Sequence, residues 1–403
     1  MEYMKDYPSE FAKPLEICFQ LLERCNIDIF DDDITPLKKY LQYLVMILCV
    51  TVHYVSLAMF TVNVIMESRE VIDFSATVPF IMVASQGIFK VVIILLNKKE
   101  IRGIIVQLGS IWRVAGLTRE QIEKKNADLK RLKFCQQVYY HSAITSSWIY
   151  SLLPLTEVVV RTFVLRQDAE LTLPYPCKYP FDPSQSWFIY CLVYPFEMYC
   201  MFRFIYAYLG AEFVMEALCS HLVTEFRLLR EDLMLIKPVP NKRSSEGIDE
   251  IGEFVKKHQK LTLLSKQLDD IYNKVNFIVL LFATVIIGFF AFAVKVSHGY
   301  KMLVNSLAVY GMLLPVFIMC YYSQLLAVES AGIAVSAYNS PWYKGGTHHQ
   351  KSIYFIIKRA QLPCYLTSLK YSPITLKTFS KVLSTTWSYF SLVTRVYEHG
   401  NEG

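Results

Sequence analysis

Charged side chains are scarce in this 403-residue chain. Only 19% of its residues are Asp, Glu, Lys or Arg, and 54% are hydrophobic, whereas about 25% of residues are charged in an average soluble domain. A soluble protein of this size could not cover its surface with so few charges. The net charge of +6 is too small to indicate nucleic-acid binding, and no basic stripe with interleaved aromatic residues occurs. The composition therefore predicts a membrane protein.

The motifs of common catalytic and cofactor sites are also missing. The chain has no Gly-rich phosphate loop, no His-Glu-x-x-His and no Cys-x-x-Cys. His348 and His349 are adjacent, so their side chains diverge, and no Cys or carboxylate lies near them in the sequence. The carboxylates of Asp31–Asp33 precede Pro36, where acidic residues favour the start of a helix. We expect no enzymatic activity, no cofactor and no metal site.

The ten cysteines do not form the pattern of a disulfide framework. Cys177 alone lies in a clearly exterior loop, and the others lie in apolar stretches or on the expected inner side, where thiols stay reduced. No Asn-x-Ser/Thr sequon occurs, which fits a protein with little mass outside the cell. We expect most of these cysteines to be small buried apolar residues.

Seven apolar stretches, each close to the ~20 residues that a membrane-spanning helix needs, are separated by polar segments. They lie at about residues 40–62, 73–96, 138–163, 187–212, 275–296, 302–327 and 372–396. Residues 1–39 are acidic and mixed, so we expect a cytoplasmic N-terminal segment and no cleaved signal peptide. The pattern predicts an all-α polytopic membrane protein with seven transmembrane helices.

The segments between these stretches differ in their Lys and Arg content. The segments at 97–137 and 328–371 are rich in both residues. The other side holds only Arg69, Arg166, Lys178 and Lys301. Because short loops rich in Lys and Arg stay in the cytoplasm, seven spans place the N-terminus inside and the C-terminus outside. That orientation is the reverse of a G-protein-coupled receptor.

Charged residues within the spans are costly and therefore indicate a role. Glu157 and Arg161 are four residues apart near the end of the third span, so we expect them to pair on one helix face. Glu197 and Arg203 interrupt the fourth span beside Pro195. They indicate either a kink or a hydrated cavity, and the sequence does not choose between the two.

The last span has an unusual polar stripe. Its uncharged stretch covers only residues 382–394, which makes it a doubtful span by hydropathy. At 100° per residue, six polar residues fall within an arc of about 80°: Lys377, Lys381, Ser384, Ser388, Ser391 and Arg395. The far side carries Leu383, Trp387, Phe390 and Val393. This pattern favours a helix that lines a pore, with its apolar side against other helices. The alternative to a pore is a dry helix bundle in which the serine hydroxyls bond to polar groups of neighbouring helices. That alternative does not explain the two lysines and the arginine on the same stripe.

The last third of the chain resembles the insect olfactory receptor family of odorant-gated ion channels. The similarity covers residues 320–396 and is carried by Glu329-Ser330, Tyr338, Trp342, the run Lys358–Pro363 and the closing segment Trp387–Leu392. The Pro-rich segment 173–182 also resembles the second outer loop of that family. The length is typical of an odorant-tuned subunit, because the shared co-receptor of the family carries a large insert that the 213–274 segment lacks.

The resemblance implies a tetramer in which four copies of the last helix surround one cation pore. Residues 40–327 would hold spans 1–6, 328–371 a cytoplasmic anchor, 372–396 the pore-lining span and 397–403 an extracellular tail. The pore and gate positions would be Ser388, Ser391, Leu392, Arg395 and Val396, with Leu392 at the hydrophobic gate. Arg395 stands where a neutral Gln is common in the family. Four arginines would raise a strong barrier to cations, so we expect a heterotetramer with co-receptor subunits.

The resemblance also places a ligand pocket for a small volatile odorant among the second, third, fourth and sixth spans. The matching positions are Val78, Ile81, Ser147, Trp148, Ser151, Tyr190, Tyr194, Val304 and Leu307. Such a lining suits a small molecule held by shape and dispersion, with a few hydroxyl groups that select its orientation. The other expected partner is the lipid of the plasma membrane, and we expect no nucleic acid.

Three other functions remain open at this point. The first is a metabotropic seven-helix chemoreceptor, which the orientation and the lack of Asp-Arg-Tyr and Asn-Pro-x-x-Tyr motifs disfavour. The second is a gustatory-type receptor channel, whose closing Thr-Tyr…Gln-Phe motif is replaced here by Ser388-Tyr389…Arg395-Val396. The third is a transporter, for which a repeated half or paired broken helices would be expected.

Overall fold

A computed structural model of the chain describes residue 4 and residues 6–30, 36–67, 71–167, 170–238 and 245–401. The acidic run Asp31–Asp33 lies outside the described residues. These parts of the chain are almost entirely helical, which confirms the all-α prediction. A hairpin of two short strands, β1 (Thr367–Ser368) and β2 (Ser372–Pro373), pairs antiparallel before the last helix.

The α-helices of the described residues follow one another in a simple order. They are α1 (Ser9–Glu23), α2 (Pro36–Glu67), α3 (Val71–Leu96), α4 (Lys98–Ile111), α5 (Arg119–Val159), α6 (Trp187–Leu235), α7 (Ser245–Val296), α8 (Tyr300–Asn339), α9 (Thr347–Ala360) and α10 (Leu376–Asn401). A π-helical turn at Val160–Val164 extends α5, and short 3₁₀ helices lie at Pro183–Gln185 and Trp342–Lys344.

Six of the described helices, namely α2, α3 and α5 to α8, are long and apolar enough to cross a membrane. They contain the first six predicted spans. Most of the predicted seventh span lies in α10, which is not among the six because its many Ser and Thr residues, with Lys381 and Arg395, lower its hydropathy. α5 to α8 have 40 to 52 residues. At 1.5 Å per residue they are about 60–78 Å long, twice the ~30 Å hydrocarbon thickness of a bilayer.

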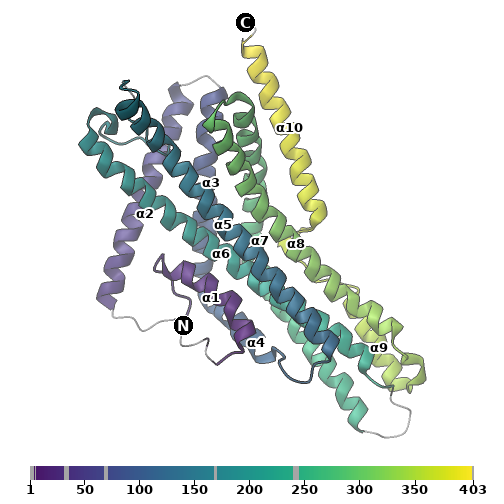
Figure 1. Cartoon of the computed structure of the whole chain (residues 1–403). Helices are drawn as coiled ribbons and strands as arrows, with labels where there is room; N and C mark the ends of the chain where they lie inside the picture. Colours follow the sequence, from purple (N-terminus) through teal and green to yellow (C-terminus); the bar gives the residue numbers. More distant parts are fainter. Residues whose placement is uncertain are drawn as a thin grey trace.

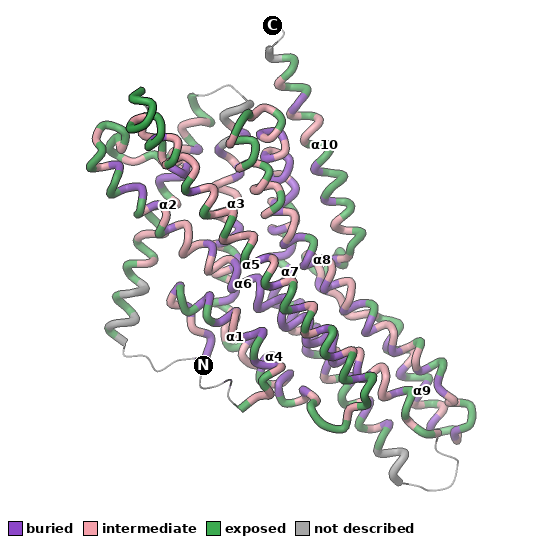
Figure 2. Tube along the Cα trace, viewed as in Figure 1, coloured by how far each residue is buried: buried purple, intermediate pink, exposed green. Residues whose placement is uncertain are grey.

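The long helices therefore continue well beyond one side of a membrane, where α4 and α9 pack against them (Figure 1). We call this part of the bundle the anchor end. The predicted polar segments at 97–137, 213–274 and 328–371 are thus largely helical. The middle of α6 lies at the centre of the bundle, and every residue from Leu209 to Phe226 is buried (Figure 2). Burial on all sides explains why this helix continues through the segment that hydropathy marks as polar.

Buried ion pairs join three long helices at the anchor end. Arg227 of α6 donates to Asp128 of α5 at 2.5 Å and to Glu329 of α8 at 2.8 Å. Arg230 reaches the second oxygen of Glu329 at 2.7 Å. A Cβ at Gly332 would lie 2.9 Å from Cδ of Arg230, so only glycine leaves room for this arginine. Glu329 therefore fixes the register of α8 against α6.

Replacing Glu329 with Gln should destabilise the bundle markedly. The change removes one of the two carboxylates that compensate Arg227, and breaking a buried ion pair costs about 3–5 kcal/mol. We expect a lower unfolding temperature and reduced surface delivery, measured by thermal denaturation in detergent and by surface labelling. Glu123→Gln is the matched control, because Glu123 is exposed and its one ion pair among the described residues is with exposed Arg119. Equal effects of the two changes would contradict the assigned role of Glu329.

The β1–β2 hairpin holds the start of α10 against α7. Asp269 of α7 accepts hydrogen bonds from the backbone N–H of Thr367 at 2.6 Å and from Nζ of Lys370 at 2.6 Å. Partial burial opposes the charge on Lys370, but hydrogen bonds from its ammonium group to Asp269 and Asp270 outweigh that effect and raise its pKa. The hairpin thereby couples the position of α10 to that of α7.

Candidate ligand pocket and last helix

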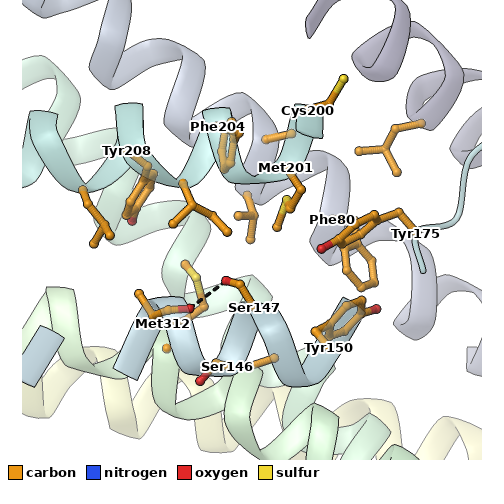
Figure 3. Close-up of a pocket in the computed structure, with 18 of the residues that line it drawn as sticks. Phe80, Ser146, Ser147, Tyr150, Tyr175, Cys200, Met201, Phe204, Tyr208 and Met312 are labelled. Carbon is orange, nitrogen blue, oxygen red and sulfur yellow. Dashed lines mark hydrogen bonds between the residues drawn. The ribbon is translucent and has the colours of Figure 1, made fainter. Parts of the chain in front are cut away.

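A cavity of about 220 Å³ lies inside the bundle, away from the anchor end. α2, α3, α5, α6 and α8 all contribute to its wall, with single residues from α7 and from the loop before α6. The wall is mostly aliphatic and aromatic, and the side chains from α5 and α6 face each other across it (Figure 3). Such a wall suits a small apolar molecule bound by dispersion and shape.

Aromatic rings close one end of this cavity. Tyr150 of α5 and Tyr175 of the loop are stacked, with ring centroids 5.4 Å apart. Phe80 of α3 contacts Tyr150, Tyr175 and Phe290 of α7 edge-on, with centroids 5.6, 6.4 and 5.8 Å away. Edge-to-face and offset contacts of this kind are favourable beyond their buried area. Phe80 is therefore at the centre of a rigid aromatic cluster (Figure 3).

The loop between α5 and α6 places Tyr175 in the bundle. The Lys178 N–H donates to the Ser56 carbonyl of α2 at 3.0 Å, and the Tyr175 hydroxyl lies 3.1 Å from Ser151 Oγ of α5. The Tyr179 hydroxyl donates to buried Glu197 of α6 at 2.9 Å. Burial raises the pKa of both loop tyrosines, so their hydroxyls stay protonated. The loop therefore acts as a fixed lid tied to three helices.

The other end of the cavity carries two tyrosine hydroxyls. Tyr139 of α5 and Tyr208 of α6 line the wall, and their hydroxyls interact with each other. Behind Tyr208, the Lys90 ammonium lies 4.0 Å from the ring centroid and pairs with Glu212 at 2.5 Å. Hydroxyl groups in a mostly apolar wall favour a ligand that can hydrogen-bond to them. A bound molecule with one oxygen atom would offer this pair an acceptor.

The predicted ligand-binding residues separate into two groups. Ser147, Val304 and Leu307 line the cavity. The others lie outside its wall: Val78, Ile81, Trp148, Ser151, Tyr190 and Tyr194. Of these, Ser151 bonds to Tyr175, and the Tyr194 hydroxyl donates to the Ser151 carbonyl, so both support the lid.

Trp148 lies on the outside of the bundle. It is 45% exposed and packs on Phe202 of α6, with ring centroids 4.7 Å apart. Tyr190 is buried, but its hydroxyl donates to the Thr172 carbonyl at 3.0 Å, outside the cavity. Trp148 follows Ser147 by one residue, and one residue turns a helix by about 100°. This rotation explains why Ser147 faces the cavity whereas Trp148 does not.

Several wall residues lie outside the predicted set. The tyrosines and phenylalanines among them are Tyr54, Phe80, Tyr139, Tyr150, Tyr175, Phe204, Tyr208 and Phe290. Tyr175 lies in a loop, where hydrophobic periodicity carries no information about direction. The Pro residues on both sides of Tyr175 were the available signal, because they restrict the loop to few conformations.

α10 stands at one side of the bundle and packs on α7 and α8 (Figure 1). Val382, Thr386 and Thr394 are its buried residues, and the Thr386 hydroxyl donates to the Thr284 carbonyl of α7 at 3.3 Å. Gly288 of α7 lies against the same face, and a Cβ there would be in ordinary contact with Cβ of Tyr389 at 3.5 Å. These contacts define the packed face of α10.

The predicted polar stripe lies opposite this packed face. Lys377, Lys381, Ser384, Ser388 and Arg395 are exposed, and Ser391 is half-buried. The predicted gate residues Leu392 and Val396 are exposed beside the stripe. Leu383 and Trp387, which we expected to pack against other helices, are exposed as well. The helix is rotated so that Phe390 and Val393, but not these two residues, turn toward α7.

The charged residues predicted within the spans have different surroundings. Glu157 and Arg161 pair at 2.7 Å, as predicted. Glu197 is fully buried and bonds to the lid through Tyr179. Arg203 is half-buried on another side of α6 and forms no ion pair within the described residues. Glu197 thus has a hydrogen-bond partner in the lid, whereas Arg203 has no carboxylate partner among the described residues.

Comparison with known proteins identifies the family. The model of the 7tm odorant receptor family matches residues 70–387. Odorant receptor 85c of Drosophila melanogaster is 22% identical to this chain, and the match covers 81% of this chain and 83% of that receptor. Odorant receptor 85b of the same species is 24% identical, and the match covers 77% of this chain and 79% of that receptor. The structure of the insect olfactory receptor OR5 from Machilis hrabei in complex with eugenol superimposes with a TM-score of 0.81 at 16% identity, over 96% of this chain and 98% of that one. The chain is a multi-pass membrane protein that belongs to the 7tm odorant receptor family.

Proposed function

We propose that the chain is an odorant-gated cation channel subunit whose ligand binds in the cavity among α2, α3, α5, α6 and α8. The observation that carries this proposal is the apolar, aromatic-lined cavity in a member of the odorant receptor family. Its volume of about 220 Å³ is below the roughly 300–1,000 Å³ of typical drug-sized sites. A small volatile molecule matches this size, and the complex of OR5 with eugenol supports a small-molecule ligand in this fold.

The cavity also suggests the orientation of the ligand. The apolar part would contact Phe80, Tyr150 and Tyr175 at the aromatic end, and an oxygen atom would accept hydrogen bonds from Tyr139 and Tyr208 at the other. An odorant with one carbonyl, ether or hydroxyl oxygen fits both ends. The same odorant without the oxygen atom offers these two hydroxyls no acceptor.

The exposed stripe of α10 supports a pore between subunits. Its polar residues face away from the chain's own bundle, and the exposed Trp387 beside it offers apolar surface to a neighbouring subunit. Arg395 on the stripe makes a pore of four identical copies unfavourable for cations, so the assembly would be a heterotetramer with co-receptor subunits. This assembly remains part of the proposal.

The functional test is the whole-cell current of cells that express the chain with and without an insect olfactory co-receptor. We expect a cation current only with the co-receptor, and only for some members of a panel of volatiles that pairs each oxygenated compound with its hydrocarbon analogue. A response that needs a G protein and no co-receptor would overturn the channel proposal.

The proposed plasma-membrane topology has a cytoplasmic N-terminus and an extracellular C-terminus, because the anchor end carries most of the Lys and Arg of the segments between spans. An epitope tag before Met1 should be labelled only after permeabilisation, and a tag after Gly403 should be labelled on intact cells. Antibody labelling by flow cytometry measures both. An N-terminal tag that is labelled on unbroken cells would contradict this orientation.

A further inference from the structure

A groove on the outside of the bundle contains two arginines without carboxylate partners. It lies where the end of α1 meets α6, and its wall includes Arg24, Tyr199, Arg203 and Tyr206. The Arg203 guanidinium lies 5.1 Å from the ring centroid of Tyr199, and that of Arg24 lies 4.9 Å from the ring centroid of Tyr206. Within the described residues, neither guanidinium forms an ion pair. The two cations are therefore positioned by aromatic rings alone.

The end of α1 holds this groove in a fixed shape. Asn26 adopts a positive φ of 58°, which ends the helix, and the Cys25 thiol donates to the Arg203 carbonyl at 3.0 Å. Leu22 packs on Gly210 of α6, where a Cβ would lie within 3 Å of the leucine side chain. Arg24 is thereby fixed beside Arg203, although the two residues come from separate helices.

The position along α6 indicates what lies next to the groove. Arg203 is in the sixteenth position after Trp187, which starts α6, so it lies ~24 Å along the helix from that end. The hydrocarbon core of a bilayer is about 30 Å thick and interfacial tryptophans mark its boundary. Arg203 is therefore near the opposite boundary, on the side of α1, where its long side chain reaches the lipid headgroups.

We propose that Arg24 and Arg203 bind the phosphate of an anionic membrane lipid in the leaflet on the side of α1. Guanidinium groups bind phosphate through paired charge-assisted hydrogen bonds, and a lipid phosphate supplies the counter-charge that the described residues do not. Exposed Tyr199 and half-buried Phe202 border the groove toward the acyl chains. The carboxylate of Glu23 also lines the groove and opposes an anion, so it weakens this site.

The test measures binding of dioctanoyl phosphatidylglycerol to the purified full-length chain by native mass spectrometry. We expect this lipid to bind more tightly than dioctanoyl phosphatidylcholine, whose headgroup carries its own positive charge. The double change Arg24→Gln and Arg203→Gln should weaken binding by about tenfold or more, since each arginine contributes charge-assisted hydrogen bonds. Glu23→Gln should strengthen it severalfold because it removes the opposing charge.

Arg119→Gln is the control, because it removes the same charge from an exposed position of α5 outside the groove; it should leave binding unchanged. If the double variant does not fold, two milder changes still test the site. One is Glu23→Gln, and the other is Arg203→Lys, which keeps the positive charge and should keep part of the lipid affinity. Equal binding of the two lipids, an unaffected double variant, or displacement of the lipid by inorganic phosphate at the same concentration would each overturn the proposal.

Discussion

Replacing Phe80 with Ala should raise the odorant concentration for half-maximal current by more than tenfold. Phe80 contacts Tyr150, Tyr175 and Phe290 and forms part of the cavity wall. The change removes ligand contact and loosens the aromatic end at once. Losing a buried aromatic contact costs ~1.5–3 kcal/mol, and each 1.4 kcal/mol changes affinity tenfold. Dose–response curves of cells that co-express the co-receptor measure this shift.

Trp148→Ala is the matched control for this experiment. It also removes an aromatic ring from a spanning helix, but Trp148 lies on the outside of the bundle against Phe202. We expect its dose response to stay within about threefold of the wild type, with surface labelling retained in both variants. If Trp148→Ala shifts the response and Phe80→Ala does not, the odorant binds outside the cavity.

The sequence predicted the helices better than the directions of their side chains. The span boundaries followed from apolar runs, because the bilayer requires about 20 apolar residues in each helix. The length of α6 did not follow, since Glu212, Glu216 and Glu225 lower its hydropathy although all three are buried. The ammonium group of Lys90 compensates the negative charge of Glu212, although the two residues are 122 positions apart in the sequence. No local sequence pattern reveals such a partner.

The candidate pocket shows the same limit at the level of single residues. The helices expected to surround the ligand do surround the cavity, and α2 joins them. One position of helical rotation nevertheless separates Ser147 in the wall from Trp148 outside it. Tyr175 reaches the wall through a loop whose path depends on hydrogen bonds to Ser56 and Ser151, which are distant in sequence. Family resemblance therefore named helices that line the cavity, and packing determines which of their side chains form its wall.

The orientation of α10 followed from sequence because its polar stripe is long and continuous. Six polar positions at helical spacing define one face, and the structure leaves that face uncovered by the chain's own helices. The opposite, packed face was less predictable. Thr386 and Thr394 are buried whereas Trp387 is exposed, and the Thr386 hydroxyl donates to the Thr284 carbonyl of α7. Hydrophobicity alone does not reveal such a polar contact between helices that are distant in sequence.

Changes on α10 should alter conduction without altering odorant selectivity. Leu392→Ala should raise the current without ligand, because a smaller side chain widens and hydrates a hydrophobic constriction. Arg395→Gln should change single-channel conductance or cation permeability, since a unit charge ~4 Å from a passing ion costs about 1 kcal/mol even at the dielectric constant of water. Both residues are exposed on α10 and lie outside the cavity wall, so the order of preferred odorants should stay the same.

Two controls separate a pore effect from a general disturbance of the helix or of its charge. Leu383→Ala makes the same truncation at an exposed position of α10 away from the polar stripe, and it should leave the basal current low. Lys301→Gln removes one positive charge from an exposed position at the start of α8, and it should leave conductance unchanged. Single-channel recordings of the heteromeric channel provide both readings. A constriction and a fixed charge cannot both be removed from a pore without effect. If Leu392→Ala and Arg395→Gln match their controls in basal current, conductance and ion selectivity, α10 therefore does not border the conducting path.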